Sequence, residues 1–150
     1  VNYYTRTTVS KFNDGTKHDA PKNDLGWEIY PEGLVRCAED LYKILERPIY
    51  ITENGTCDNQ DTFRSKYIYE HLGVIRESKL PITRYYHWCF CDNFEWVEGE
   101  SSRFGLVHIN YETQERSIKN AGHFYASMIE EDGVTEELYK EYVKEQQYHY

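Results

Sequence analysis

The stretch IYITENGT, residues 49–56, decides how the rest of this chain is interpreted. It begins with three residues that favour β-strands, Ile-Tyr-Ile, and ends with Asn54-Gly55, which is a strong turn signal. Between them stands a single acid, Glu53. A lone glutamate at the end of a strand is usually solvated or paired in a salt bridge. The pattern therefore predicts a strand with a carboxylate at its carboxyl end, and its neighbours must show whether that carboxylate has a function.

The same order of strand, loop and helix recurs three times along the chain. Strands are expected at residues 1–4, 48–52 and 81–90, and the helices that follow them at residues 31–45, 63–75 and 117–131. Residues 10–26 are expected to form a long loop, and residues 106–109 a short additional strand. Thr135 is expected to cap a last helix. Strands that alternate with helices predict an α/β fold with a parallel sheet covered by helices.

The length of the chain limits how much of such a fold it contains. A closed eight-stranded β/α barrel needs roughly 250 residues, whereas this chain has 150 residues and three strand–helix units. A parallel sheet with two open edges exposes unpaired backbone groups, which proteins normally cover. We therefore expect a part of a larger architecture. The first residue is Val1, so an upstream piece is expected and a signal peptide remains an open question.

Composition excludes several classes of protein. The net charge of −9 argues against a nucleic-acid-binding surface, which needs a basic stripe. No apolar run approaches the roughly 18 residues of a membrane span, so no membrane partner is expected. Hydrophobic residues make up 39% of the chain, which is enough for a folded core.

The four cysteines form no CxxC pair, and we interpret them as free, buried thiols of a cytoplasmic protein. His87, Cys89 and Cys91 would share one face of the third strand, but no fourth ligand is apparent. We therefore expect neither a metal site nor a cofactor.

Polar and aromatic residues follow each predicted strand: Tyr4, Glu53-Asn54, and the segment from Trp88 to Trp96. In α/β folds the carboxyl ends of the strands form the site. A carboxylate beside indole rings suits a sugar, because it accepts hydrogen bonds from hydroxyls while the ring covers the C–H face. Tyr4 could reach the Glu53 carboxylate, which could then attack an anomeric carbon. The plainer alternative is a strand end with core tryptophans and solvated acids.

Four motifs in this order resemble the C-terminal third of glycoside hydrolase family 1, the retaining β-glucosidases and β-galactosidases. They are GWEIYPEGL, IYITENG, DNFEW and RFGL. The resemblance covers residues 1–132 and implies a partial (β/α)8 TIM barrel that holds strands six to eight. Residues 133–150 would form a C-terminal helical extension.

The resemblance also implies roles for individual residues. Glu53 matches the catalytic nucleophile, and Tyr4 its hydrogen-bonding partner. Trp88 matches the floor under the sugar, and Glu95 the clamp on its distal hydroxyls. The remaining matches are Asn2 in the sugar subsite, Trp96 beside the clamp and Phe104 in the pocket wall. Family members that act on 6-phosphorylated sugars resemble one another in having Ser where this chain has Glu95, so the implied substrates are unphosphorylated β-glucosides or β-galactosides.

One part of the family's machinery has no match in the chain. The acid/base of the family lies in an Asn-Glu-Pro motif, and no such motif occurs in these 150 residues. Three explanations stay open: a piece of a longer enzyme, a truncated fragment, or a partial barrel that assembles with another chain or a second copy. The alternative function is a non-catalytic fragment with a weak carbohydrate-binding site.

Overall fold

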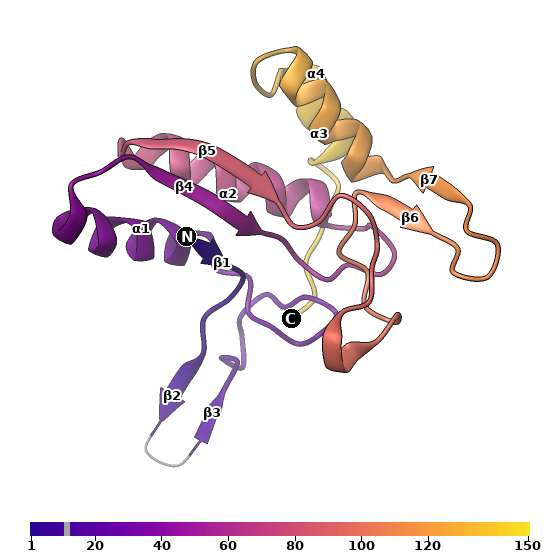
Figure 1. The fold of residues 1–150 in the computed structure, drawn as a ribbon, viewed down its shortest axis with the longest axis horizontal. Helices are drawn as coiled ribbons and strands as arrows, with labels where there is room; N and C mark the ends of the chain where they lie inside the picture. The colour runs from indigo at the N-terminus through magenta and orange to yellow at the C-terminus, as the bar shows by residue number, and fades with distance from the viewer. Residues whose placement is uncertain (11–12) are drawn as a thin grey trace.

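A computed structural model describes residues 1–10 and 13–150. Three parallel strands form its central sheet, in the order β1 (Asn2–Tyr3), β4 (Ile49–Asn54) and β5 (Ile82–His87). Helix α1 (Pro31–Leu45) connects β1 to β4, and α2 (Arg64–Ser78) connects β4 to β5. Figure 1 shows this layered arrangement, with both helices beside the sheet. The predicted α/β class with a parallel sheet is therefore confirmed.

In the part of the chain that the structure describes, helices cover one face of the sheet. Leu34 and Ala38 of α1 are fully buried against Ile51 of β4, because apolar side chains at helical spacing meet the inward side chains of the strand. On the opposite face, Tyr50 and Tyr86 are 47% and 48% exposed. Among the described residues, β1 and β5 each have one unpaired edge. This open sheet has the form expected of one segment of a larger barrel.

The prediction of a single loop after β1 is wrong, and the helix predicted at residues 117–131 begins later than expected. Residues 10–26 are not a single loop, because β2 (Thr8–Ser10) and β3 (Asn13–Gly15) pair as an antiparallel hairpin that projects from the body (Figure 1). Strand β6 (Val107–Ile109) exists as predicted, but it pairs antiparallel with β7 (Arg116–Ile118) and lies outside the central sheet. Helix α3 (Asn120–Glu130) consequently begins three residues later than residue 117.

The cysteines also differ from expectation. Strand β5 ends at His87, so Cys89 and Cys91 lie beyond it and do not share a strand face with His87. All four cysteines are free, but Cys37 is exposed and Cys91 is half-buried. The prediction that every thiol is buried is thus wrong for these two.

The chain after residue 132 packs on the body. The Thr135 hydroxyl accepts a hydrogen bond from the Leu138 amide at 3.2 Å and caps α4 (Glu136–Tyr142), as predicted. Val143 is buried in the core formed by α2 and α3, and the Tyr148 hydroxyl donates a 2.6 Å hydrogen bond to Glu70 of α2. No helix of the described residues is long and apolar enough to cross a membrane.

Candidate active site

Glu53 lies near the carboxyl end of β4, at the edge of the sheet where all three parallel strands end. Its backbone is paired in register with Asn2 of β1. The ends of β1 and β5 bring Tyr4 and Trp88 to the same edge. Gly55 is required here because a Cβ at this position would overlap the carbonyl of Trp88. Strand pairing and this close approach therefore place the three predicted side chains together.

The Tyr4 hydroxyl donates a 2.8 Å hydrogen bond to Oε2 of Glu53. Burial, followed by the hydrogen bond and the negative charge of Glu53, raises the pKa of Tyr4 far above its ordinary value. Tyr4 is consequently a protonated donor at neutral pH. It fixes the orientation of one carboxylate oxygen and leaves the other available to a ligand.

Asn54 forms a rigid support behind Glu53. Its buried side-chain amide donates to the Tyr3 carbonyl at 2.7 Å and to the Tyr67 hydroxyl at 2.9 Å. Its carbonyl oxygen accepts a 2.8 Å hydrogen bond from the Tyr85 hydroxyl. Neighbours from β1, α2 and β5 thus hold the residue next to Glu53, which limits the movement of the carboxylate.

A cavity of about 310 Å³ opens beside Glu53. This volume is within the range of pockets that hold a small ligand. It is lined by Tyr4, Trp27, Glu53, Trp88, Glu95, Trp96 and Phe104. Six of the seven site residues named from the sequence therefore come together. Asn2 does not line the cavity: it is exposed, and its side-chain oxygen accepts a hydrogen bond from Thr52.

Trp27 is the cavity residue that the sequence reasoning missed. Its ring lies 6.4 Å from that of Tyr4 and 6.0 Å from that of Phe104, so it completes an aromatic wall. The Asn23 side chain holds the Trp27 backbone by accepting a 2.9 Å hydrogen bond from its amide. Trp27 stands in the GWEIYPEGL motif, and an indole in a polar loop was the signal that could have identified it.

Glu95 is the second carboxylate of the cavity. Burial raises its pKa, the Trp88 side chain opposes that rise as a hydrogen-bond donor, and the negative charge of Glu53 adds to it. Glu53 is therefore close enough to Glu95 to act on it electrostatically. Such a pair can accept hydrogen bonds from the hydroxyls of one ligand.

The loop that carries Glu95 is anchored by Asp92. This buried carboxylate accepts hydrogen bonds from Lys119 Nζ at 2.8 Å and from the Gly105 amide at 2.9 Å. Arg103 Nη1 lies 3.4 Å from the same carboxylate. These contacts tie the loop after β5 to the start of α3.

Arg64, the first residue of α2, joins the loop after β4 to the loop that holds Phe104. Its guanidinium is fully buried, and all five N–H donors are used. Nε donates to Asp61 at 2.9 Å. The other four bonds, at 2.6 to 3.0 Å, reach the backbone carbonyls of Thr56, Asp58, Arg103 and Phe104. The sequence contains no signal that Arg64 would be buried and would join these two loops.

The described residues contain no group of three or more His, Cys, Asp or Glu side chains placed to hold a metal ion. The side chains that line the cavity offer two carboxylates, a tyrosine hydroxyl and aromatic rings. Such a set can bind a polyhydroxylated ring and can supply one nucleophile.

Comparison with known proteins identifies the family of the chain. The family model described as glycosyl hydrolase family 1 matches residues 2–134, and the chain belongs to this family. It is 42% identical over 119 residues to a β-glucosidase of Agrobacterium sp., which covers 71% of this chain and 26% of the relative. It is 35% identical over 133 residues to a β-galactosidase of Pyrococcus woesei, covering 86% of this chain and 26% of the relative.

Solved structures match the fold as well. The β-glucosidase of Thermotoga maritima in complex with castanospermine superposes with a TM-score of 0.80 at 32% identity. The match covers 90% of this chain and 34% of that one. The chain therefore spans about a quarter to a third of the length of the relatives to which it is similar.

Proposed function

We propose that this chain carries the nucleophile and the sugar-binding end of a retaining β-glycosidase. The hydrogen bond from Tyr4 to Glu53 at the rim of an aromatic cavity carries this proposal. A carboxylate held by a neutral donor, with one oxygen facing a cavity lined by three tryptophans, suits attack on a pyranose. Membership of glycosyl hydrolase family 1, whose compared members are β-glucosidases and β-galactosidases, supports it.

The reaction proceeds in two displacements. First, a carboxylate oxygen of Glu53 bonds to the anomeric carbon while the bond to the aglycone oxygen breaks, and that oxygen takes a proton from the acid/base. Second, the same group removes a proton from water, which attacks the anomeric carbon and releases Glu53. The acid/base is supplied from outside these 150 residues, because no Asn-Glu-Pro motif occurs among them.

The remaining site residues bind the sugar. Trp88 packs under the ring, Glu95 accepts hydrogen bonds from the distal hydroxyls, and Trp96 and Phe104 complete that end of the cavity. Asn2 is assigned to the sugar subsite on the resemblance alone. A carboxylate at Glu95 repels a 6-phosphate, so the substrates are unphosphorylated β-glucosides or β-galactosides.

The strands β1, β4 and β5 take the places of strands six, seven and eight of a (β/α)8 barrel. The open sheet face with Tyr50 and Tyr86, and the two unpaired edges, then bind the rest of the barrel. A second copy of the chain is the other partner that could cover them. Residues 133–150 are the C-terminal extension of this unit.

A substrate with an activated leaving group tests the nucleophile alone, because its cleavage does not need the acid/base. Dinitrophenolate leaves without protonation, so the chain should release about one equivalent of it from 2,4-dinitrophenyl β-glucoside and then stop. Cellobiose, whose leaving group needs the acid, should remain intact. Glu53→Gln should abolish the release. Failure of the wild-type chain to release dinitrophenolate, together with measurable glucose binding, would favour the non-catalytic carbohydrate-binding alternative.

The substrate class has its own test. Dinitrophenyl β-glucoside and its 6-phosphate are compared as single-turnover substrates of the same chain. The unphosphorylated compound should react faster than the 6-phosphate. Glu95→Ser should reduce the difference between the two rates, because it removes the charge that repels the phosphate. Faster reaction of the 6-phosphate with the wild-type chain would overturn the assignment.

A further inference from the structure

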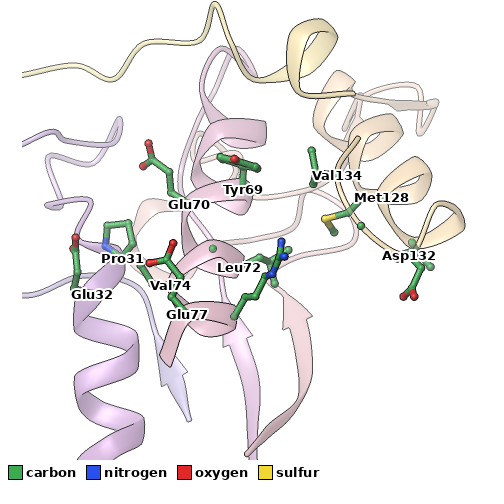
Figure 2. A pocket seen from close by; sticks show the side chains of 14 residues that line it. Pro31, Glu32, Tyr69, Glu70, Leu72, Val74, Glu77, Met128, Asp132 and Val134 are labelled. Carbon is green, nitrogen blue, oxygen red and sulfur yellow. The ribbon is translucent and has the colours of Figure 1, made fainter. Parts of the chain in front are cut away.

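A second cavity, of about 1130 Å³, lies on the helical side of the molecule, far from the chemistry of Glu53. Figure 2 shows it between the start of α1 and the end of α3, with α2 between them. We call it the outer groove. Pockets for small molecules usually hold 300 to 1,000 Å³ and converge on a few polar groups. The outer groove is larger and extends from α1 across α2 to the end of α3, which suits a polypeptide.

The middle of the groove is formed by Gly73 of α2. A Cβ built at this position has no heavy atom within 4 Å, so nothing in the described chain fills the space above it. A glycine inside a helix costs stability relative to alanine, and no internal contact requires one here. The observable consequence is a flat place where another backbone can approach α2 closely.

The groove faces away from the sheet. Gly73 is two positions from Ile75, or about 200° around the helix axis, and Ile75 packs on the core between the helices and the sheet. The missing strands would meet the opposite face and the edges of the sheet. Strands that extend the sheet at its edges would therefore not reach the face of α2 that carries Gly73.

The walls of the groove are apolar. Leu72 of α2 and Met128 and Val134 near the end of α3 contribute aliphatic or thioether surface. Ile129 is 63% exposed at the same place. Methionine and branched aliphatic side chains adapt well to the apolar face of a helix.

The rim of the groove is acidic. Its charged residues are Glu32, Glu70, Glu77, Asp132 and a single cation, Arg76. Glu70 lies 3.4 Å from Lys66, whereas no described cation lies within salt-bridge distance of the other three acids. The rim thus offers uncompensated negative charge around an apolar floor.

From this combination we infer that the outer groove binds a cationic amphipathic helix of a partner protein. The apolar face of that helix packs over Gly73, and its Lys or Arg side chains reach Glu32, Glu77 and Asp132. The inference does not depend on the activity assigned to Glu53.

Fluorescence anisotropy with a labelled 14-residue Leu/Lys amphipathic peptide tests this surface. A Leu/Glu peptide of the same apolar pattern is the probe control. Gly73→Leu places a side chain on the floor of the groove, where a Cβ has no heavy atom within 4 Å, and replaces glycine by a better helix former. The variant should keep or raise the midpoint of thermal unfolding and bind the Leu/Lys peptide at least about tenfold more weakly.

A charge variant provides a second, independent readout. Glu77→Lys with Asp132→Lys should weaken binding, and 0.5 M salt should weaken binding to the wild-type chain. Glu112→Lys with Glu115→Lys, in the turn between β6 and β7, changes the net charge equally and should have little effect. Equal binding by all variants, or none by the wild-type chain, would overturn the inference. Loss of self-association in Gly73→Leu, with no peptide binding by either protein, would instead identify a contact between copies and also overturn it.

Discussion

The hydroxyl of Tyr4 and Oε2 of Glu53 are joined by a 2.8 Å hydrogen bond across 49 positions of sequence. Parallel pairing makes this contact possible, because Asn2 of β1 lies opposite Glu53 of β4 and Tyr4 follows just beyond the end of β1. The cavity opens beside the same carboxylate. This hydrogen bond links the fold to the proposed chemistry, and its loss should change the rate of the first displacement.

Tyr4→Phe should slow the first release of dinitrophenolate from dinitrophenyl β-glucoside about tenfold or more. The reason is the loss of a hydrogen bond to a charged group, which contributes roughly 1.5–3 kcal/mol. Stopped-flow absorbance measures the rate. Tyr139→Phe on α4 is the matched control and should react like the wild-type chain. Equal rates for Tyr4→Phe and the wild-type chain would argue against a role of this bond in orienting Glu53.

Trp27→Ala should weaken the binding of glucose about tenfold, because it removes one aromatic wall of the cavity. Calorimetry is the suitable measurement, since loss of a tryptophan alters fluorescence by itself. Trp27→Phe keeps an aromatic ring and should bind with an intermediate affinity. Unchanged affinity in Trp27→Ala would show that this wall does not contact the ligand.

Arg64→Lys should destabilise the chain by about 3–5 kcal/mol, as does the breaking of other buried charged networks. A lysine has three donors at one point and cannot reach the five acceptors that the guanidinium serves. Urea unfolding gives the loss of stability. Arg84→Lys changes an exposed arginine of β5 and should cost little. Similar midpoints for the two variants would contradict the role of Arg64 as the link between the two loops.

Stability should fall as the pH drops from about 6.5 to about 4. Burial lowers the pKa of His71 from its ordinary 6.5 to about 4. Between these values the unfolded chain binds a proton and the folded chain does not, so protonation favours unfolding. The stabilisation present above pH 6.5 is thus lost on acidification, with an expected size of roughly 3 kcal/mol.

Urea unfolding at a series of pH values measures this dependence. His71→Phe keeps a ring stacked on Tyr67, whose centroid lies 3.8 Å from that of His71, and should flatten the curve. Burial also lowers the pKa of His87, which adds to the same trend in both proteins. His123→Phe, on the exposed side of α3, is the matched histidine-to-phenylalanine control. If the free energy of unfolding depended on pH equally in His71→Phe and the wild-type chain, His71 would not be the source of the pH dependence.

The central sheet could be predicted because its residues have strong local signals. The strand that precedes Glu53 has β-branched and aromatic residues and a turn behind it, and α1 has proline at its first position and regular apolar spacing. Most residues that line the cavity could be predicted because they directly follow predicted strands. The role of each residue was predicted from the resemblance in four motifs.

The rest depended on contacts between distant segments. The β2–β3 hairpin and the β6–β7 pair are short antiparallel additions in polar sequence, where period-two patterns are weak. Trp27 lies in a loop without periodicity. Arg64 begins a helix, where a charged residue is ordinarily exposed, and only the fold shows that five acceptors surround it. Asn2 was placed in the site by resemblance, and here it is exposed and bonded to Thr52.

The most direct test of the central claim is to identify the nucleophile by mass spectrometry. The chain is incubated with 2,4-dinitrophenyl 2-deoxy-2-fluoro-β-glucoside, whose leaving group needs no acid and whose fluorine slows release of the glycosyl-enzyme. The account predicts one attached fluoroglucosyl group, on the peptide that contains Glu53, and none in Glu53→Gln. An unlabelled wild-type chain, or a label on Glu95 with Glu53 unmodified, would contradict it.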